Sequence, residues 1–301
     1  MFDQFFILMA ESSAFFITIV TLLSLLVGSF LNVVIYRVPV MMEREWDCEC
    51  REFLADELKP TKGSKKEATQ DATNETFNLV KPDSHCPKCH AAVKPWQNIP
   101  IFSYLFLKGK CGSCQTPISI RYPAIEALTA LASAVVAVKF GYSLQTLVLV
   151  PLTWVFICLI FIDIDKMLLP DQLTQPLLWF VLLASVWGVF LTPKYTIIGA
   201  AAGYLSLWSV YWLFKIVTGK EGMGYGDFKL MAIVGAVVGA VKLPMVVLLS
   251  SLVGAVIGIS MMVFGDKTRN TQIPFGPYIA IAGWLTMLWG DAMLNWYMAF
   301  L

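Results

Sequence analysis

Charge is scarce in this sequence. Only 14% of the 301 residues are charged, whereas 57% are hydrophobic, and the formal net charge is +1. Soluble domains carry roughly 25% charged and about 45–50% apolar residues, so the composition excludes an ordinary cytosolic enzyme. The near-neutral balance gives no reason to expect a nucleic acid partner. No separate cleavable signal peptide is evident, because the first apolar run, residues 14–36, is long enough to cross a bilayer by itself.

Eight apolar runs predict an all-α polytopic membrane protein with about eight transmembrane helices. The runs cover residues 14–36, 124–140, 144–162, 173–191, 196–217, 228–241, 245–264 and 278–298. The run 228–241 has only 14 residues and is short for a span. Two interpretations stay open for it: a half-helix, or a helix whose glycine-rich entry is sunk into the protein.

The distribution of lysine and arginine predicts the orientation. With eight spans and an outside N-terminus, 19 of these residues fall on the inner side and 3 on the outer side. Because cytoplasmic segments carry the excess of positive charge, both termini are expected outside. Three regions follow: a first transmembrane helix (1–36), a cytoplasmic loop domain (37–122) and a membrane domain of about seven helices (123–301).

The loop domain combines a polar stretch with paired cysteines. Its first half is polar and irregular, and residues from about 55 to 80 are expected to be a flexible insert. Between residues 85 and 115 lie two C-x-x-C pairs, which can complete a tetrahedral Zn²⁺ site. The candidate ligands are Cys86, Cys89, Cys111 and Cys114. Disulfides or free thiols are the alternatives, and a reducing compartment disfavours disulfides. Cys48 and Cys50 are expected to be surface thiols.

Two aspartates lie at the edges of apolar runs. Asp163 ends the run that starts at residue 144, and Asp227 follows the glycine-rich stretch 222–226. Carboxylates at such positions are costly and usually functional. Two of them brought together can share one proton, an arrangement that hydrolyses peptide bonds. The simpler interpretation makes Asp227 a helix N-cap.

The neighbours of these aspartates leave one choice open. Asp165 is only two residues from Asp163, so either could face Asp227; as a surface charge, Asp165 could also be solvated or paired. Asp171 is favoured as an N-cap for the next helix. Gly224 and Gly226 let the backbone turn sharply and let a substrate strand approach.

Other glycines have a different expected role. Those around Asp227 are not a nucleotide-binding fingerprint, because no βαβ unit surrounds them. The small-x-x-x-small patterns at residues 235–239 and 254–258 indicate close helix packing, which would help to bring distant aspartates together.

These motifs together resemble the bacterial type IV prepilin peptidase family. The resemblance covers nearly the whole chain and rests on the order and number of the matches. They are Gly28-Ser-Phe-Leu-Asn-Val-Val-Ile-Tyr-Arg37, the paired cysteines, Arg121-Tyr-Pro-Ala-Ile-Glu126, residues 163–171 and Met223-Gly-Tyr-Gly-Asp-Phe-Lys-Leu230.

The resemblance implies an aspartic protease of the bacterial inner membrane. It would remove a basic leader from type IV prepilins or type II secretion pseudopilins on the cytoplasmic side, with Asp163 and Asp227 as the catalytic pair. It also implies N-methylation of the new N-terminus with S-adenosylmethionine, whose binding residues the sequence does not place. The alternatives are a transporter with the aspartates as coupling sites, and a zinc-loop assembly protein without catalysis.

Overall fold

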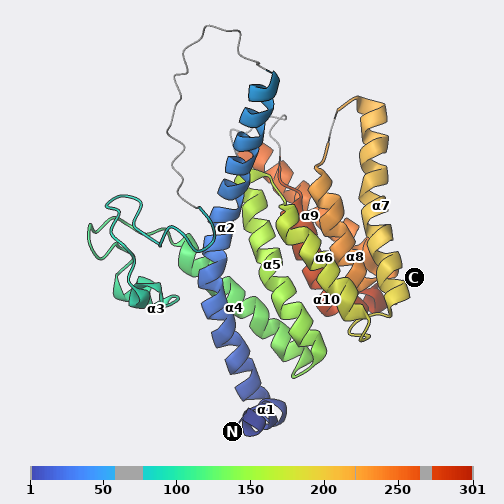
Figure 1. Ribbon diagram of the computed structural model, residues 1–301. Coiled ribbons are helices and arrows are strands. Elements are labelled where there is room, and N and C mark those ends of the chain that lie inside the picture. Colours follow the sequence, from blue (N-terminus) through green and yellow to red (C-terminus); the bar gives the residue numbers. More distant parts are fainter. Residues whose placement is uncertain (1, 58–76, 221, 265–272, 300–301) are drawn as a thin grey trace.

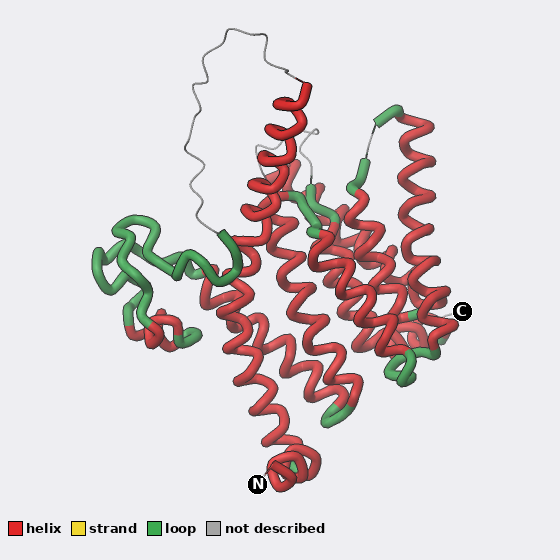
Figure 2. Tube along the Cα trace, in the orientation of Figure 1, coloured by secondary structure: helices red, strands yellow, loops and turns green. Residues whose placement is uncertain are grey.

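The computed structural model of the protein describes residues 2–57, 77–220, 222–264 and 273–299. In these residues the regular structure is helical, with no β-strand and two isolated bridges, His85 with Ala92 and Lys110 with Pro117. Figure 2 shows that most of the loop structure lies to one side of a helical bundle. The predicted all-α fold is confirmed.

The elements are long helices with two short 3-10 segments. In chain order they are α1 (Phe2–Glu11), α2 (Ser13–Glu57), η1 (Pro95–Asn98), α3 (Phe102–Phe106), α4 (Arg121–Phe140), α5 (Leu144–Lys166), α6 (Asp171–Ser185), α7 (Pro193–Thr218), α8 (Tyr225–Val238), η2 (Ala240–Lys242), α9 (Leu243–Phe264) and α10 (Gly276–Met298). Figure 1 shows the long helices running side by side, with α1 at the lower end of α2. Helix α3 lies to the left of α2, away from the other long helices.

Eight of these helices, α2 and α4 to α10, coincide with the eight apolar runs. Within the described residues, five segments are long and apolar enough to cross a membrane: Ser13–Leu54, Arg121–Phe140, Leu144–Lys166, Pro193–Thr218 and Ala240–Ser260. The multi-pass character is therefore supported by length and composition. The count of eight stays a prediction, because α6 and α8 have only 15 and 14 residues.

Helix α2 differs from the expectation. It does not end at residue 36 but continues to Glu57, so the start of the loop domain is helical rather than irregular. Residues 41–57 contain no glycine or proline and many strong helix formers, which explains the continuation. An ion pair between Glu43 and Lys166 holds this extension against the end of α5. The expected insert falls largely on residues 58–76, outside the described residues.

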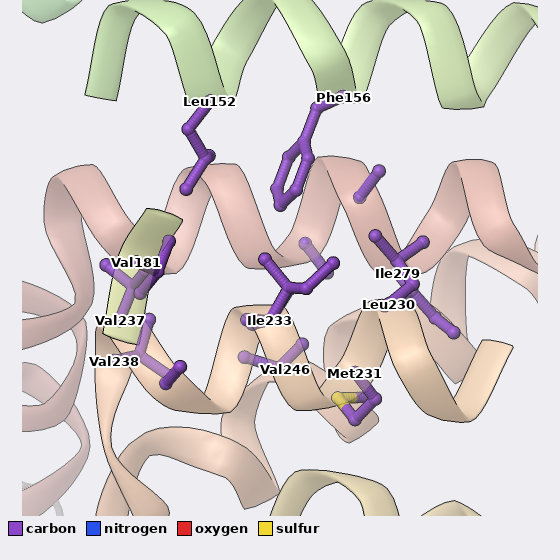
Figure 3. Close-up of a cluster of buried hydrophobic side chains, with 14 of the residues drawn as sticks. Leu152, Phe156, Val181, Leu230, Met231, Ile233, Val237, Val238, Val246 and Ile279 are labelled. Atoms are coloured by element: carbon purple, nitrogen blue, oxygen red, sulfur yellow. The ribbon is translucent and has the colours of Figure 1, made fainter. Parts of the chain in front are cut away.

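Helix α8 lies at the centre of the bundle. It packs against α6, α7 and α10, and its middle residues are fully buried: Leu230, Met231, Ile233 and Val234. Figure 3 shows these side chains in one cluster with Leu152 and Phe156 of α5 and Ile279 of α10. Because protein surrounds it, a short helix fits here. This arrangement favours the interpretation of a helix sunk into the protein.

Glycines allow α7 and α8 to approach each other closely. A Cβ placed on Gly235 of α8 would collide with the carbonyl oxygen of Gly199 in α7, and the reverse also holds. A Cβ on Gly203 would collide with the carbonyl oxygen of Met231. In α9, a Cβ on Gly254 would lie 3.1 Å from the Tyr278 ring of α10. Close packing at the predicted small-residue patterns is confirmed.

This packing gives a first prediction. Gly235→Val forces α7 and α8 apart, and we expect a loss of about 1–3 kcal/mol or more in unfolding free energy, as overpacked cores show. Thermal unfolding of the detergent-solubilised protein measures it. Gly224→Ala is the control, because an added Cβ there meets nothing within 4 Å. Equal unfolding midpoints for the two variants would contradict the packing argument.

Candidate functional site

Asp163 lies in the last turn of α5. Its backbone carbonyl accepts a hydrogen bond of 2.9 Å from Met167, whose left-handed conformation ends the helix. The side chain points into the protein and is only 5% exposed. Its Oδ2 atom is buried and has no hydrogen-bond partner among the described residues. The carboxyl group is therefore buried, with one oxygen left without a hydrogen-bond partner.

Asp227 lies in the first turn of α8, two residues after the helix begins at Tyr225. The helix N-cap is Gly224, so the interpretation of Asp227 as an N-cap is wrong. The Asp227 side chain is 7% exposed. Its carboxyl group is close enough to Asp163 for the two charges to repel each other. Two chain segments 64 positions apart thus contribute one buried carboxylate pair.

Helix α10 and the loop after α5 complete the surroundings of the pair. The Gly276 backbone interacts with the Asp163 carboxyl group, and a Cβ on Gly276 would lie 2.6 Å from Asp163 Oδ2. A Cβ on Gly226 would lie 2.7 Å from Cβ of Leu169, which also lies beside Gly276. Glycine at residues 226 and 276 therefore lets α8 and α10 start next to the end of α5.

Sequence reasoning missed the contribution of α10. Tyr278 is buried and lies close enough to Asp163 to interact electrostatically with its carboxylate, so it also belongs to the surroundings of the pair. The available signal was the run Phe275-Gly-Pro-Tyr278, because proline in the first turn after a glycine is typical of a helix start. Nothing in that pattern links the helix start to the aspartates.

Asp165 has a different environment from Asp163. It forms a bidentate ion pair with Arg121 of α4, with N–O distances of 2.5 and 2.8 Å, and it is partly exposed. Glu126, which lies five residues further along α4 than Arg121, does not pair with it. Glu126 accepts a hydrogen bond of 2.8 Å from the Ile101 amide. Of the two candidates on α5, the structure brings Asp163 to Asp227 and turns Asp165 to Arg121.

Asp171 is not the N-cap that the sequence predicts. The N-cap of α6 is Pro170, and Asp171 is the first helical residue. Its carboxylate accepts hydrogen bonds of 2.5 and 2.7 Å from Nζ of Lys229. This ion pair joins the start of α6 to the start of α8, two residues after Asp227.

The four cysteines form one cluster. Each can offer a sulfur atom, and the four sulfurs lie within 4.8 Å of one another. The Sγ atoms of Cys86 and Cys114 are 3.7 Å apart. The histidines beside the first pair, His85 and His90, stack on each other and are not part of the cluster. The predicted ligands are thus brought together, and they are able to hold a metal ion.

The two cysteine pairs stand on matching turns. The amide of Cys86 donates to the Ala91 carbonyl, and that of Cys111 donates to the Thr116 carbonyl, at 3.0 and 2.8 Å. His90 and Gln115, each four residues after the first cysteine of its pair, both have positive φ. The repeated geometry places each second cysteine beside its first, as a metal knuckle requires.

Hydrogen bonds prepare two of the sulfurs to act as thiolates. The Thr116 side chain and then its backbone amide lower the pKa of Cys114 to about 6. The backbone amides of Cys89 and Lys88 lower the pKa of Cys86. Metal ions bind the thiolate form. The donor set therefore fits a metal that prefers sulfur. Cys48 and Cys50 lie exposed on α2, away from this cluster.

Together these features define a class: a polytopic helical membrane protein with a buried aspartate pair and a four-cysteine centre. Comparison with known families agrees with it. Residues 22–140 match the bacterial peptidase A24 N-terminal domain, and residues 150–259 match the type IV leader peptidase family.

The chain also aligns along nearly its whole length with curated proteins named prepilin leader peptidase/N-methyltransferase. It is 51% identical to the one from Pseudomonas aeruginosa, over 95% of this chain and 94% of the relative. It is 50% identical to the one from Aeromonas salmonicida, over 94% of both chains. The Neisseria gonorrhoeae protein is 46% identical, over 95% of this chain and 96% of the relative.

The chain therefore belongs to the type IV leader peptidase family. No solved structure matches it significantly. The comparisons confirm the family inferred from the motifs and give no support to the transporter alternative.

The cysteine cluster gives a second prediction. We expect the purified unaltered protein to carry a bound metal ion and the Cys86→Ser, Cys111→Ser variant to lose it, because the two changes remove one sulfur from each knuckle. Elemental mass spectrometry of the purified proteins measures the metal content. Cys48→Ser combined with Cys50→Ser is the matched control and should keep full metal content. Unchanged metal in the Cys86/Cys111 variant would overturn the assignment.

Proposed function

We propose that this protein is an aspartic endopeptidase of the bacterial inner membrane that removes the basic leader from type IV prepilins or type II pseudopilins, and that it then methylates the new N-terminal amine. Family membership supports both activities, because the relatives carry both in their names. The observation that carries the peptidase proposal is that Asp163 and Asp227 are both buried and are close enough for their charges to repel each other.

The pair supports hydrolysis by general acid–base catalysis. One ionised aspartate takes a proton from water as the water oxygen attacks the scissile carbonyl carbon. The other, protonated, donates its proton to the carbonyl oxygen. When the C–N bond breaks, a proton moves to the leaving nitrogen. Two carboxylates that lie together in desolvated surroundings favour this half-protonated state.

The side of the membrane follows from charge. The orientation that puts 19 of the 22 lysines and arginines on the cytoplasmic side places both termini in the periplasm. In that orientation both aspartates are expected at the cytoplasmic ends of their helices. A basic leader stays on the same side for the same reason. The scissile bond, which follows the leader, then lies at the depth of the pair, and the apolar pilin helix lies in the bilayer.

Zinc is the metal that we propose for the four cysteines. Cys86, Cys89, Cys111 and Cys114 would close a tetrahedral shell, which leaves no open position for water. The metal's role is then structural: it holds the two knuckles together. Methylation draws its methyl group from S-adenosylmethionine.

The catalytic pair gives a third prediction. Asp163→Asn and Asp227→Asn should each slow leader removal roughly a thousandfold or more, because each removes an acid–base group. Asp165→Asn loses an exposed ion pair worth at most about 1 kcal/mol and should change the rate less than about fivefold. The assay incubates purified protein with a prepilin and S-adenosylmethionine, and mass spectrometry reports cleavage and methylation separately.

A pre-cleaved pilin provides the folding control in the same assay. Methylation of that substrate by the Asp163→Asn and Asp227→Asn variants would show that they remain folded. Full cleavage by both variants would reject the aspartic peptidase and favour an assembly protein without catalysis. Loss of cleavage in Asp165→Asn but not in Asp163→Asn would move the first catalytic acid to Asp165.

A further inference from the structure

The short helix α3 exposes its apolar side, whereas an ordinary surface helix buries it. Phe102, Leu105 and Phe106 stand at i, i+3 and i+4, so they share one side of the helix. They are exposed, with Leu105 at 65% and Phe106 at 82%. The more polar Ser103 and Tyr104 are the less exposed residues, and a Cβ on Gly109 would lie 2.9 Å from the Tyr104 hydroxyl. The apolar side of α3 therefore points away from its own region.

The adjoining segment adds to this surface. Trp96 of η1 and Ile99 at its end are both about half exposed. We call Trp96, Ile99, Phe102, Leu105 and Phe106 the α3 face. A soluble protein rarely exposes so many large apolar side chains in about a dozen consecutive positions without a partner.

Two contacts fix the depth of the α3 face along the bundle. Ile101, which immediately precedes α3, donates its amide to Glu126, five residues into α4. At 1.5 Å per residue, that point lies about 7 Å along the helix from its start at Arg121. Asn98, at the end of η1, lies 3.5 Å from Oγ of Ser29. Ser29 is seven residues inside the apolar run of α2, roughly 10 Å from its cytoplasmic end.

The face therefore stands beside the spanning parts of α2 and α4 and not beyond their ends. Figure 1 agrees, since α3 lies alongside α2 at the level of α4. An apolar face that lies on a bilayer is buried about 5–10 Å into the headgroup and acyl boundary. That depth matches the two contacts.

Charge points to the same partner. Residues 84–122 contain five lysines and arginines and no aspartate or glutamate. Lys88, Lys94, Lys108 and Lys110 are exposed. Basic residues around an apolar face are attracted to anionic lipids of the cytoplasmic leaflet. The same charges would repel the basic leader of a prepilin, so that segment of the substrate is a poor partner for this surface.

We propose that the α3 face inserts into the cytoplasmic leaflet and binds anionic phospholipid, with the lysines on the headgroups and the aromatic residues at the acyl boundary. The cysteine region is then attached to the membrane as well as to α2 and α4, at the end of the bundle that holds the aspartate pair. This inference rests on the orientation in the proposed function, but it does not depend on catalysis.

The test uses the full-length protein in liposomes of phosphatidylethanolamine and phosphatidylglycerol that contain a phospholipid with a diazirine in its acyl chain. After irradiation and digestion, mass spectrometry maps the lipid adducts. We expect adducts on residues 95–106, as on the lipid-facing Leu131 of α4. Phe53, on the α2 extension, is the matched control because its exposure equals that of Leu105, and it should carry none. Adducts confined to the spanning helices, or equal adducts at Phe53, would overturn the proposal.

A second experiment tests whether the lysines contribute to the binding of anionic lipid. Replacing Lys94, Lys108 and Lys110 with glutamine should lower labelling of residues 95–106 at least fivefold in phosphatidylglycerol liposomes, since each of the three lysines contributes roughly fivefold to anionic binding. In pure phosphatidylcholine the same variant should label like the unaltered protein. Unchanged labelling in phosphatidylglycerol contradicts the charge argument. Retained metal in the variant reports that the region stays folded.

A third experiment tests whether a protein, rather than lipid, contacts the α3 face. It places photoreactive p-benzoylphenylalanine at position 106 in place of Phe106. Crosslinks to lipid support the proposal. Crosslinks to a second copy of the chain, or to a prepilin added to the liposomes, would reject it in favour of a protein interface. A protein that labels as expected but cleaves no prepilin would leave this inference standing and defeat only the proposed function.

Discussion

The close backbone contact between α7 and α8 is the constraint on which the rest of the structure depends. Gly199 and Gly235 leave no room for a side chain, so the two helices touch along their backbones. Helix α8 can then sit in the middle of the bundle, covered by α6, α7 and α10. In lipid, apolar side chains gain little by burial, and small residues that permit close packing supply much of the association. The position of Asp227 follows from this packing, because it stands in the first turn of that central helix.

The same logic explains why the aspartate pair tolerates its surroundings. A carboxylate at membrane depth is stable only when it faces protein or a polar cavity. Asp163 and Asp227 meet where three helix termini converge, the end of α5 and the starts of α8 and α10. Backbone amides and carbonyls are least paired at helix termini, so polarity there is available without charged side chains. Gly226 and Gly276 are needed at this point because side chains would separate the termini.

Much of the site could be predicted because the signals are local. Each aspartate ends or begins an apolar run, and each cysteine pair has the spacing of a metal knuckle. The choice between Asp163 and Asp165 could not be made from sequence, because it depends on the rotation of α5 and on Arg121, 44 residues away, which pairs with Asp165. The sequence prediction ends the first helix with its apolar run and so misses the α2 extension, although the residues that follow favour helix. Gly276 was missed because its role is defined only by its neighbour Asp163.

The lack of a cationic partner distinguishes the pair from three acids near the same end of the bundle. Asp165 pairs with Arg121, Asp171 with Lys229, and Glu43 with Lys166. These pairs are exposed or partly exposed, where an ion pair contributes little to stability. Their effect on the site is to neutralise the acids that flank it, to join α2 and α4 to the end of α5, and to join the start of α6 to the start of α8. Among the described residues, Asp163 and Asp227 are buried and have no cation of their own. A site that needs one ionised and one protonated carboxyl group is served by this arrangement, because a neighbouring cation would stabilise the doubly ionised pair and remove the acid.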